Sequence, residues 1–218
     1  MIHLEPSHLL AADTLQLALE RAIKTWKWYV VRASGFLSAG LLFMLMISGI
    51  GHVTGLTYKY IEPLKAWAIH KAMAIALCAA IFIHVFFILI DNYVPFSLKQ
   101  ILIPFQSNYT TGAKIANISI GSWGVTLGIL AMYGSLIIVA SSLGWINSHK
   151  KSWKLLHYLS YAVFVMVFIH ALYTGYDLTH GVLRAGWMLA MAIVIVAIIS
   201  RLRRAGSLKI NNDEEPKS

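Results

Sequence analysis

The sequence predicts an all-α integral membrane protein, a bundle of five transmembrane helices with an N-terminal interfacial helix. Of the 218 residues, 58% are hydrophobic and only 12% are charged, which excludes an ordinary soluble domain. Five stretches reach the roughly 20 apolar residues that a helix needs to cross a hydrocarbon core of about 30 Å. No stretch shows the alternation of a membrane β-strand, and unpaired backbone is too costly in lipid for other spanning structures.

The five spans are expected at residues 28–50, 66–90, 120–143, 153–174 and 183–201. The chain then divides into an N-terminal interfacial segment, a transmembrane domain and a disordered polar tail, at residues 1–27, 28–202 and 203–218. Residues 9–26 mix large apolar and charged side chains, which fits a helix lying on the membrane face and equally a polar extension of the first span. Acidic residues near the start argue against a cleavable signal peptide.

The formal net charge of +9 comes from basic residues that flank the predicted spans. They do not form one surface, so membrane topology explains them better than nucleic-acid binding does. The denser set surrounds the ends that include the C-terminus, which predicts a cytoplasmic C-terminus and an outward-facing loop at residues 91–119. We expect a multi-pass protein of a bacterial plasma membrane.

Four histidines lie inside two of the predicted spans. His70 and His84 are fourteen residues apart in the second span, and His157 and His170 are thirteen apart in the fourth. An ionisable side chain inside the membrane is costly and points to function. Both spans run in the same direction and are expected to lie side by side, and a rise of 1.5 Å per residue separates the histidines by about 21 Å and 20 Å. Two cross-helix pairs result, His70 with His157 and His84 with His170.

Two neutral imidazoles on opposite faces of a haem saturate its iron, so the four histidines predict haem b, in two copies stacked across the membrane. Cys78 is the only cysteine, which excludes covalent attachment through a Cys-x-x-Cys-His motif. Buried histidines that hydrogen-bond between helices are the alternative. Zinc or copper ligands would gather at one depth, commonly with Cys, Asp or Glu.

Helix rotation supports one half of this arrangement. At about 100° per residue, His84 returns to within about 40° of His70, whereas His170 ends about 140° from His157. The fourth span must therefore bend, depart from α geometry, or let one ring reach round the helix.

The segment Trp153-Lys-Leu-Leu-His157-Tyr-Leu-Ser-Tyr161 running to His170, with His70-Lys71 running to His84, resembles the ferric reductase-like transmembrane domain. NADPH oxidases, ferric reductases and the haem subunit of a bacterial methionine sulfoxide reductase system share this domain. The resemblance extends over residues 28–200. It implies that His70 and His157 hold an inner haem and that the other two histidines hold an outer haem.

The resemblance further implies that Arg32 faces a propionate of the outer haem, where a guanidinium can bind a carboxylate through two hydrogen bonds. Snorkelling to the interface is the alternative. Lys71, His52 and Lys154 are weaker propionate candidates at the inner level. NADPH oxidases and ferric reductases carry a flavin and nicotinamide-binding domain after the last span, whereas this sequence ends soon after it, so we expect no NADPH site of the usual kind.

The predicted function is a b-type cytochrome that carries electrons across the membrane through two bis-histidine haems. The partners are membrane lipid, a separate donor (a flavoprotein or quinol) and an acceptor on the outer face, which would make the chain an oxidoreductase component. One alternative is a single-haem membrane anchor, or quinol-linked subunit, of a partner reductase. Another is a haem-free scaffold or transporter.

Overall fold

A computed structural model of the chain describes residues 6–114, 118–178 and 181–214, with side chains from residue 14 to residue 203. Its helices are α1 (Pro6–Thr54), α2 (Pro63–Ile90), α3 (Leu98–Leu102), α4 (Trp123–Gly144), α5 (Lys150–Thr174) and α6 (Gly181–Glu214), with 3₁₀ turns η1 (Thr57–Lys59) and η2 (Tyr176–Leu178). Five of the helices are long and apolar enough to cross a membrane. The predicted all-α membrane bundle is therefore confirmed, and each predicted span falls on one of these five helices.

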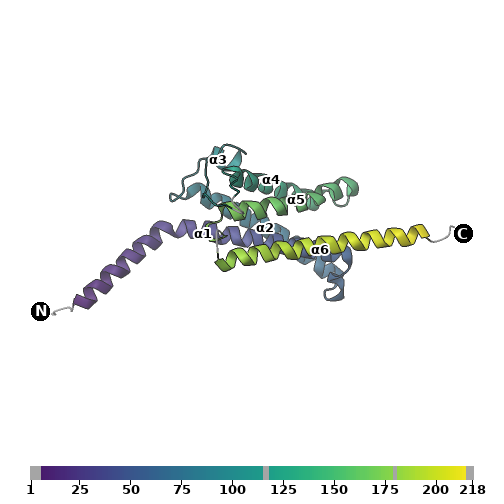
Figure 1. The fold of residues 1–218 in the computed structure, drawn as a ribbon, viewed down its shortest axis with the longest axis horizontal. Coiled ribbons are helices and arrows are strands. Elements are labelled where there is room, and N and C mark those ends of the chain that lie inside the picture. The colour runs from purple at the N-terminus through teal and green to yellow at the C-terminus, as the bar shows by residue number, and fades with distance from the viewer. Residues whose placement is uncertain (1–5, 115–117, 179–180, 215–218) are drawn as a thin grey trace.

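Two helices continue beyond their predicted spans. Because α1 runs without a break from Pro6 to Thr54, residues 9–26 extend the first span and do not form a separate helix. Figure 1 shows this extension projecting away from the bundle. Its position on the membrane face stays a prediction. Helix α6 continues to Glu214, over most of the tail that was expected to be disordered, and residues 215–218 lie outside the described residues.

The bundle consists of two helical hairpins, α1 with α2 and α4 with α5, and the packing is most extensive within each hairpin. Between the hairpins, α1 contacts α5 and α2 contacts α4, whereas α2 and α5 make no extensive contact over the described residues. The two histidine-bearing helices therefore stand diagonally across the bundle, where the sequence had suggested neighbours. Helix α6 packs on the outside, mainly against α1 (Figure 1).

Glycines allow α4 and α5 to approach closely. A Cβ atom at Gly134 would lie 2.6 Å from Cγ2 of Val163, and one at Gly124 would lie 2.9 Å from Cγ2 of Thr174. Small residues at helix interfaces strengthen van der Waals packing in lipid, where no hydrophobic effect drives helices together.

The buried core is an apolar layer at positions midway between the two histidine levels. It comprises Leu42, Met46, Leu77, Ala131, Ile138, Val163, Phe164 and Val194, from all five long helices. The layer separates the two pairs of histidines along the bundle axis.

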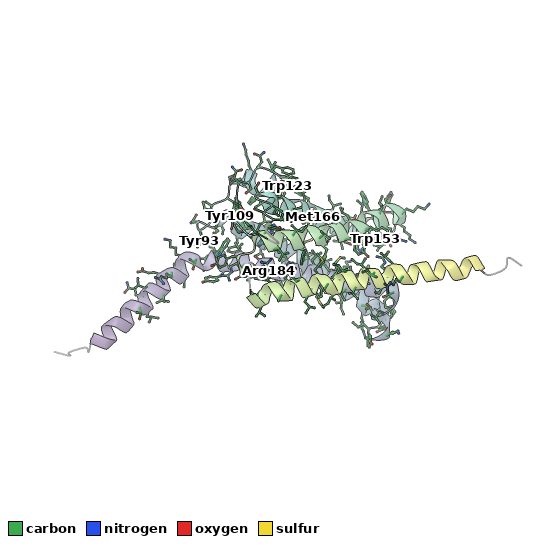
Figure 2. All side chains as sticks on the ribbon, in the orientation of Figure 1. Tyr93, Tyr109, Trp123, Trp153, Met166 and Arg184 are labelled. Atoms are coloured by element: carbon green, nitrogen blue, oxygen red, sulfur yellow. The ribbon has the colours of Figure 1, made fainter. Side chains whose placement is uncertain are left out.

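The connection between α2 and α4 is held at one end of the bundle by hydrogen bonds to α4 and α5. Helix α3 opens with a capping box of Ser97 and Gln100. The backbone N–H of Phe105 donates to the Thr126 hydroxyl at 3.1 Å, and the Thr111 hydroxyl donates to the Tyr173 carbonyl at 2.6 Å. Figure 2 shows Tyr93 and Tyr109 of this connection toward the end from which α1 projects, and Trp153 toward the opposite end.

Candidate functional site

The structure brings the four histidines together in two pairs. His70 and His157, here called the inner pair, have ring centroids 6.4 Å apart across the bundle. His84 and His170, called the outer pair, line one cavity of about 220 Å³. Each pair joins one histidine from α2 to one from α5, as the sequence spacing predicts.

The ring of His170 lies against α4, although α5 has no break that would turn the ring in this direction. Helix α5 is α-helical throughout Lys150–Thr174. The His170 ring lies against Gly128, where an added Cβ atom would stand only 2.6 Å from Cε1 and Nδ1 of the imidazole. In the other hairpin the ring of His84 lies against Gly35, with a corresponding distance of 3.1 Å to Cε1. The His170 ring therefore occupies space that a side chain at Gly128 would take, and the His84 ring packs tightly against Gly35.

Backbone carbonyls fix the protonation of the outer pair. Nδ1 of His84 is 2.9 Å from the Val31 carbonyl oxygen, and Nδ1 of His170 is 2.7 Å from the Gly124 carbonyl oxygen. A carbonyl oxygen only accepts, so each Nδ1 carries the hydrogen and donates it. The lone pair of each neutral imidazole then resides on Nε2, which is the atom available to a metal.

Serine hydroxyls serve the same purpose at the inner pair. Nδ1 of His70 is 2.7 Å from Oγ of Ser48, and Nδ1 of His157 is 3.5 Å from Oγ of Ser142. Each hydroxyl donates its single hydrogen to a carbonyl of its own helix, Leu45 at 3.1 Å and Ile138 at 2.7 Å. With those hydrogens directed to the helix carbonyls, the serine oxygens are acceptors for the imidazole Nδ1–H groups, and Nε2 is again the nitrogen that holds the lone pair.

The two hairpins repeat one arrangement. The first helix of each carries small residues fourteen positions apart, Gly35 and Gly49 on α1 and Gly128 and Ser142 on α4. Each of them faces a histidine of the second helix; Gly49 faces His70, whose Cε1 would be 3.6 Å from an added Cβ. These small residues were not predicted from the sequence, although their spacing equals that of the histidines on α2 and was the available signal.

The donor set fits haem. With a metal–nitrogen bond of about 2 Å and roughly 1 Å from Nε2 to the ring centre, two axial imidazoles have centroids about 6 Å apart, close to the inner pair. The outer cavity extends from apolar Leu42 and Leu77 past the histidines to Arg32, which suits an apolar macrocycle with charged propionates. Among the described residues, no three His, Cys, Asp or Glu side chains gather as ligands for a lone metal ion.

Arg32 lies at the mouth of the outer cavity and is paired with Asp177 of η2. Nε of Arg32 donates to Oδ2 of Asp177 at 2.7 Å, and Nη2 donates to Oδ1. Both residues line the cavity, and the guanidinium also lies over the Tyr29 ring at 5.4 Å. Asp177 was not predicted as a site residue, and its position directly after a span was the available signal. Contact of Arg32 with a propionate stays a prediction.

The three weaker candidates have different surroundings. The ring of His52 lies 5.3 Å from that of His70, and both of its nitrogens are buried without a partner among the described residues. Lys71 is exposed, with its ammonium 5.5 Å from the Trp67 ring centre, and Lys154 is exposed as well. Only His52 lies at the inner pair.

The Tyr109 phenol closes the cavity from the α2–α4 connection. Burial, and to a lesser extent the neighbouring Tyr93, raise the pKa of Tyr109 above its ordinary value. The phenol therefore remains a neutral hydrogen-bonding group at physiological pH.

Comparison with known proteins decides the family. Residues 34–168 match the family described as "Ferric reductase like transmembrane component", which is more than half of the chain. The chain belongs to the ferric reductase-like transmembrane family. This ferric reductase-like protein is thus a membrane electron-transfer component. The matched region includes His70, His84 and His157 and ends two residues before His170. No curated protein and no solved structure matches the chain.

Proposed function

We propose that this ferric reductase-like protein is a b-type cytochrome that carries electrons across the membrane through two haems, one at each histidine pair. One observation carries the proposal: each of the four Nδ1 atoms lies within hydrogen-bond distance of an oxygen that can accept from it, which leaves the four Nε2 atoms to hold the lone pairs. Interhelical hydrogen bonding alone does not require this uniform choice of nitrogen at two depths. Axial ligation of iron does require it.

The residues of the chain hold and insulate the two sites. Bound haem iron supplies a one-electron couple, and the protein supplies ligands, orientation and electrostatics. The apolar layer around Phe164 and Leu77 keeps water from the region between the pairs. Arg32, held by Asp177, places a guanidinium at the outer mouth for a propionate, and His52 offers unpartnered ring nitrogens at the inner level.

The direction of transfer follows from the charge distribution. The denser basic flanks support a topology with the inner pair near the cytoplasm, where a separate flavoprotein or quinol would donate electrons, and with the outer pair near the acceptor. The connection over the outer pair, with Tyr109 in the cavity wall, covers the site from which electrons leave.

Haem stoichiometry tests the proposal. The protein is purified after expression with added haem precursor, and its reduced-minus-oxidised spectrum is recorded together with a pyridine haemochrome assay against protein concentration. We expect a b-type spectrum and two haems per chain. One haem per chain would select the single-haem anchor of a partner reductase, and a spectrum without haem bands would select the scaffold or transporter.

A further inference from the structure

Arg201 of α6 is held against two tyrosines of α5. Its Nη1 donates to the Tyr161 hydroxyl, and its guanidinium carbon lies 5.5 Å from the ring centre of Tyr158 and 5.7 Å from that of Tyr161. These contacts give a long, flexible side chain a defined position. Arg201 is thus an oriented cation at the end of the membrane-spanning part of α6.

This cation lies beside the inner pair. Tyr158 directly follows His157 in α5, and Tyr161 lies one turn further along. Because Arg201 contacts both tyrosines, its guanidinium lies within about one helical turn of His157 along α5. Because α6 packs mainly on α1 and on the outside of the bundle, Arg201 is a contribution of this helix to the surroundings of the inner pair.

The guanidinium has no carboxylate partner within the described part of the chain. The ion pairs described there are Arg32–Asp177 and Lys65–Glu62. A guanidinium has five N–H donors in a planar fork, and the Tyr161 hydroxyl takes one of them. An oriented guanidinium with unused donors in a planar fork is suited to bind a carboxylate. The outer site shows the satisfied case, in which Arg32 binds a carboxylate with two of its nitrogens.

We propose that Arg201 binds a propionate carboxylate of the haem at the inner pair, so that α6 forms part of that site. The inference rests on the proposed function, because it requires haem between His70 and His157. A haem carries two carboxylates at one edge, and the guanidinium fork matches their geometry. A phospholipid headgroup offers similar anionic oxygens, and the experiment separates the two sources.

The test is a redox titration of Arg201→Gln. A nearby cation favours the haem that has gained an electron, so its loss lowers the midpoint potential of the inner haem. We expect a three- to tenfold shift in the equilibrium between oxidised and reduced inner haem, where tenfold corresponds to about 59 mV for a one-electron couple. The outer haem keeps its potential. The same titration in a His170→Ala background, in which only the inner haem remains, assigns the shift in potential to the inner haem.

Two further variants distinguish charge from helix docking. Arg201→Lys keeps the cation without the fork, and we expect less than half of the Arg201→Gln shift. Tyr161→Phe removes the hydrogen bond that holds Arg201 on α5 but leaves its charge, and we expect nearly the wild-type potential. If Tyr161→Phe reproduced the full shift, Arg201 would act by docking α6, and the inference would be overturned.

Lipid composition separates propionate from phosphate. The titrations are repeated in nanodiscs of zwitterionic lipid alone and with added anionic lipid. A propionate contact gives the Arg201→Gln shift in both, whereas a shift confined to anionic lipid assigns the contact to a headgroup and overturns the inference. An unchanged inner potential in haem-replete Arg201→Gln also overturns it and leaves the proposed function standing. A wild-type protein without haem overturns both.

Discussion

The inner and outer pairs both consist of histidines, but the surrounding residues hold the two pairs differently. At the outer pair, backbone carbonyls accept from both Nδ1 atoms, glycines make room for both rings, and the Arg32–Asp177 pair lies at the cavity mouth. At the inner pair, serine hydroxyls accept from Nδ1, and His52 lies close by without partners. The outer histidines are therefore held by backbone groups, whereas side chains hold the inner histidines. Single substitutions should tune the inner site and disrupt the outer site mainly through steric crowding.

Removing one ligand from each pair gives the largest expected effect. His170→Ala should lose the outer haem and His157→Ala the inner haem, so each variant keeps about half of the haem and loses a different part of the redox titration. Pyridine haemochrome assays and redox titrations measure both losses. His149→Ala, which changes an exposed histidine, should retain both haems. Complete loss of haem from each single ligand variant would contradict separable sites.

A series of Gly→Ala variants tests whether the histidine rings need the space beside these glycines. The added Cβ would stand 2.6 Å from the His170 ring at Gly128, 3.1 Å from the His84 ring at Gly35 and 3.6 Å from the His70 ring at Gly49. The first distance requires the ring to move, the second a small adjustment, and the third is ordinary contact. Haem occupancy should therefore fall most for Gly128→Ala, less for Gly35→Ala and hardly for Gly49→Ala.

The matched control for this series is Gly40→Ala, because nothing lies within 4 Å of the Cβ position at Gly40. Electron paramagnetic resonance of the oxidised protein would report displaced imidazoles as a change from low-spin to high-spin iron. Equal losses across the series would show that the glycines matter for helix packing in general and not for the rings.

Ser48→Ala should weaken the inner site more than Ser34→Ala weakens the outer one. Oγ of Ser48 is the hydrogen-bond partner of His70 Nδ1 at 2.7 Å. Oγ of Ser34 lies 3.5 Å from Nδ1 of His84, and without Ser34 this nitrogen still has the Val31 carbonyl as its acceptor. Loss of such a partner commonly costs about 10- to 100-fold in metal affinity. Haem retention during competition with apomyoglobin measures the difference, and equal retention in the two variants would contradict it.

Asp177→Asn gives the smallest expected effect. The variant removes the ion pair between Arg32 of α1 and Asp177 of η2. Because the Arg32 side chain is partly exposed, the free energy of unfolding should fall by about 1 kcal/mol. Thermal unfolding in detergent measures it. Glu62→Gln, which removes the exposed pair with Lys65, is the matched control and should leave the unfolding temperature unchanged. A larger effect from Glu62→Gln than from Asp177→Asn would contradict this ranking.

The spans were predictable because apolar length alone specifies a membrane helix, and the predicted and observed helices differ mainly at their ends. The diagonal position of α2 and α5 was not predictable, since hydropathy does not say which apolar face meets which helix. Nor could composition decide between a separate N-terminal helix and an extension of α1, because residues 9–26 suit both.

The histidines were predictable because an ionisable side chain is conspicuous within an apolar run. The residues that hold the imidazole rings in place were not predictable. Ser48, Gly35 and Gly128 resemble the ordinary small residues of helix interfaces, and only their positions beside the imidazoles reveal a role. Asp177 lies outside the spans and meets Arg32 through tertiary structure that the sequence pattern does not encode.

The division of the histidines between two hairpins has a consequence for how the protein matures. Neither pair exists until α5, which ends at Thr174, has joined α2 across the bundle. During synthesis the first hairpin enters the membrane with two solitary imidazoles, already oriented by their own hairpin partner. If the proposed function holds, ligation of haem by both histidines of a pair would follow insertion of the second hairpin, and the bound haem would then link the two hairpins.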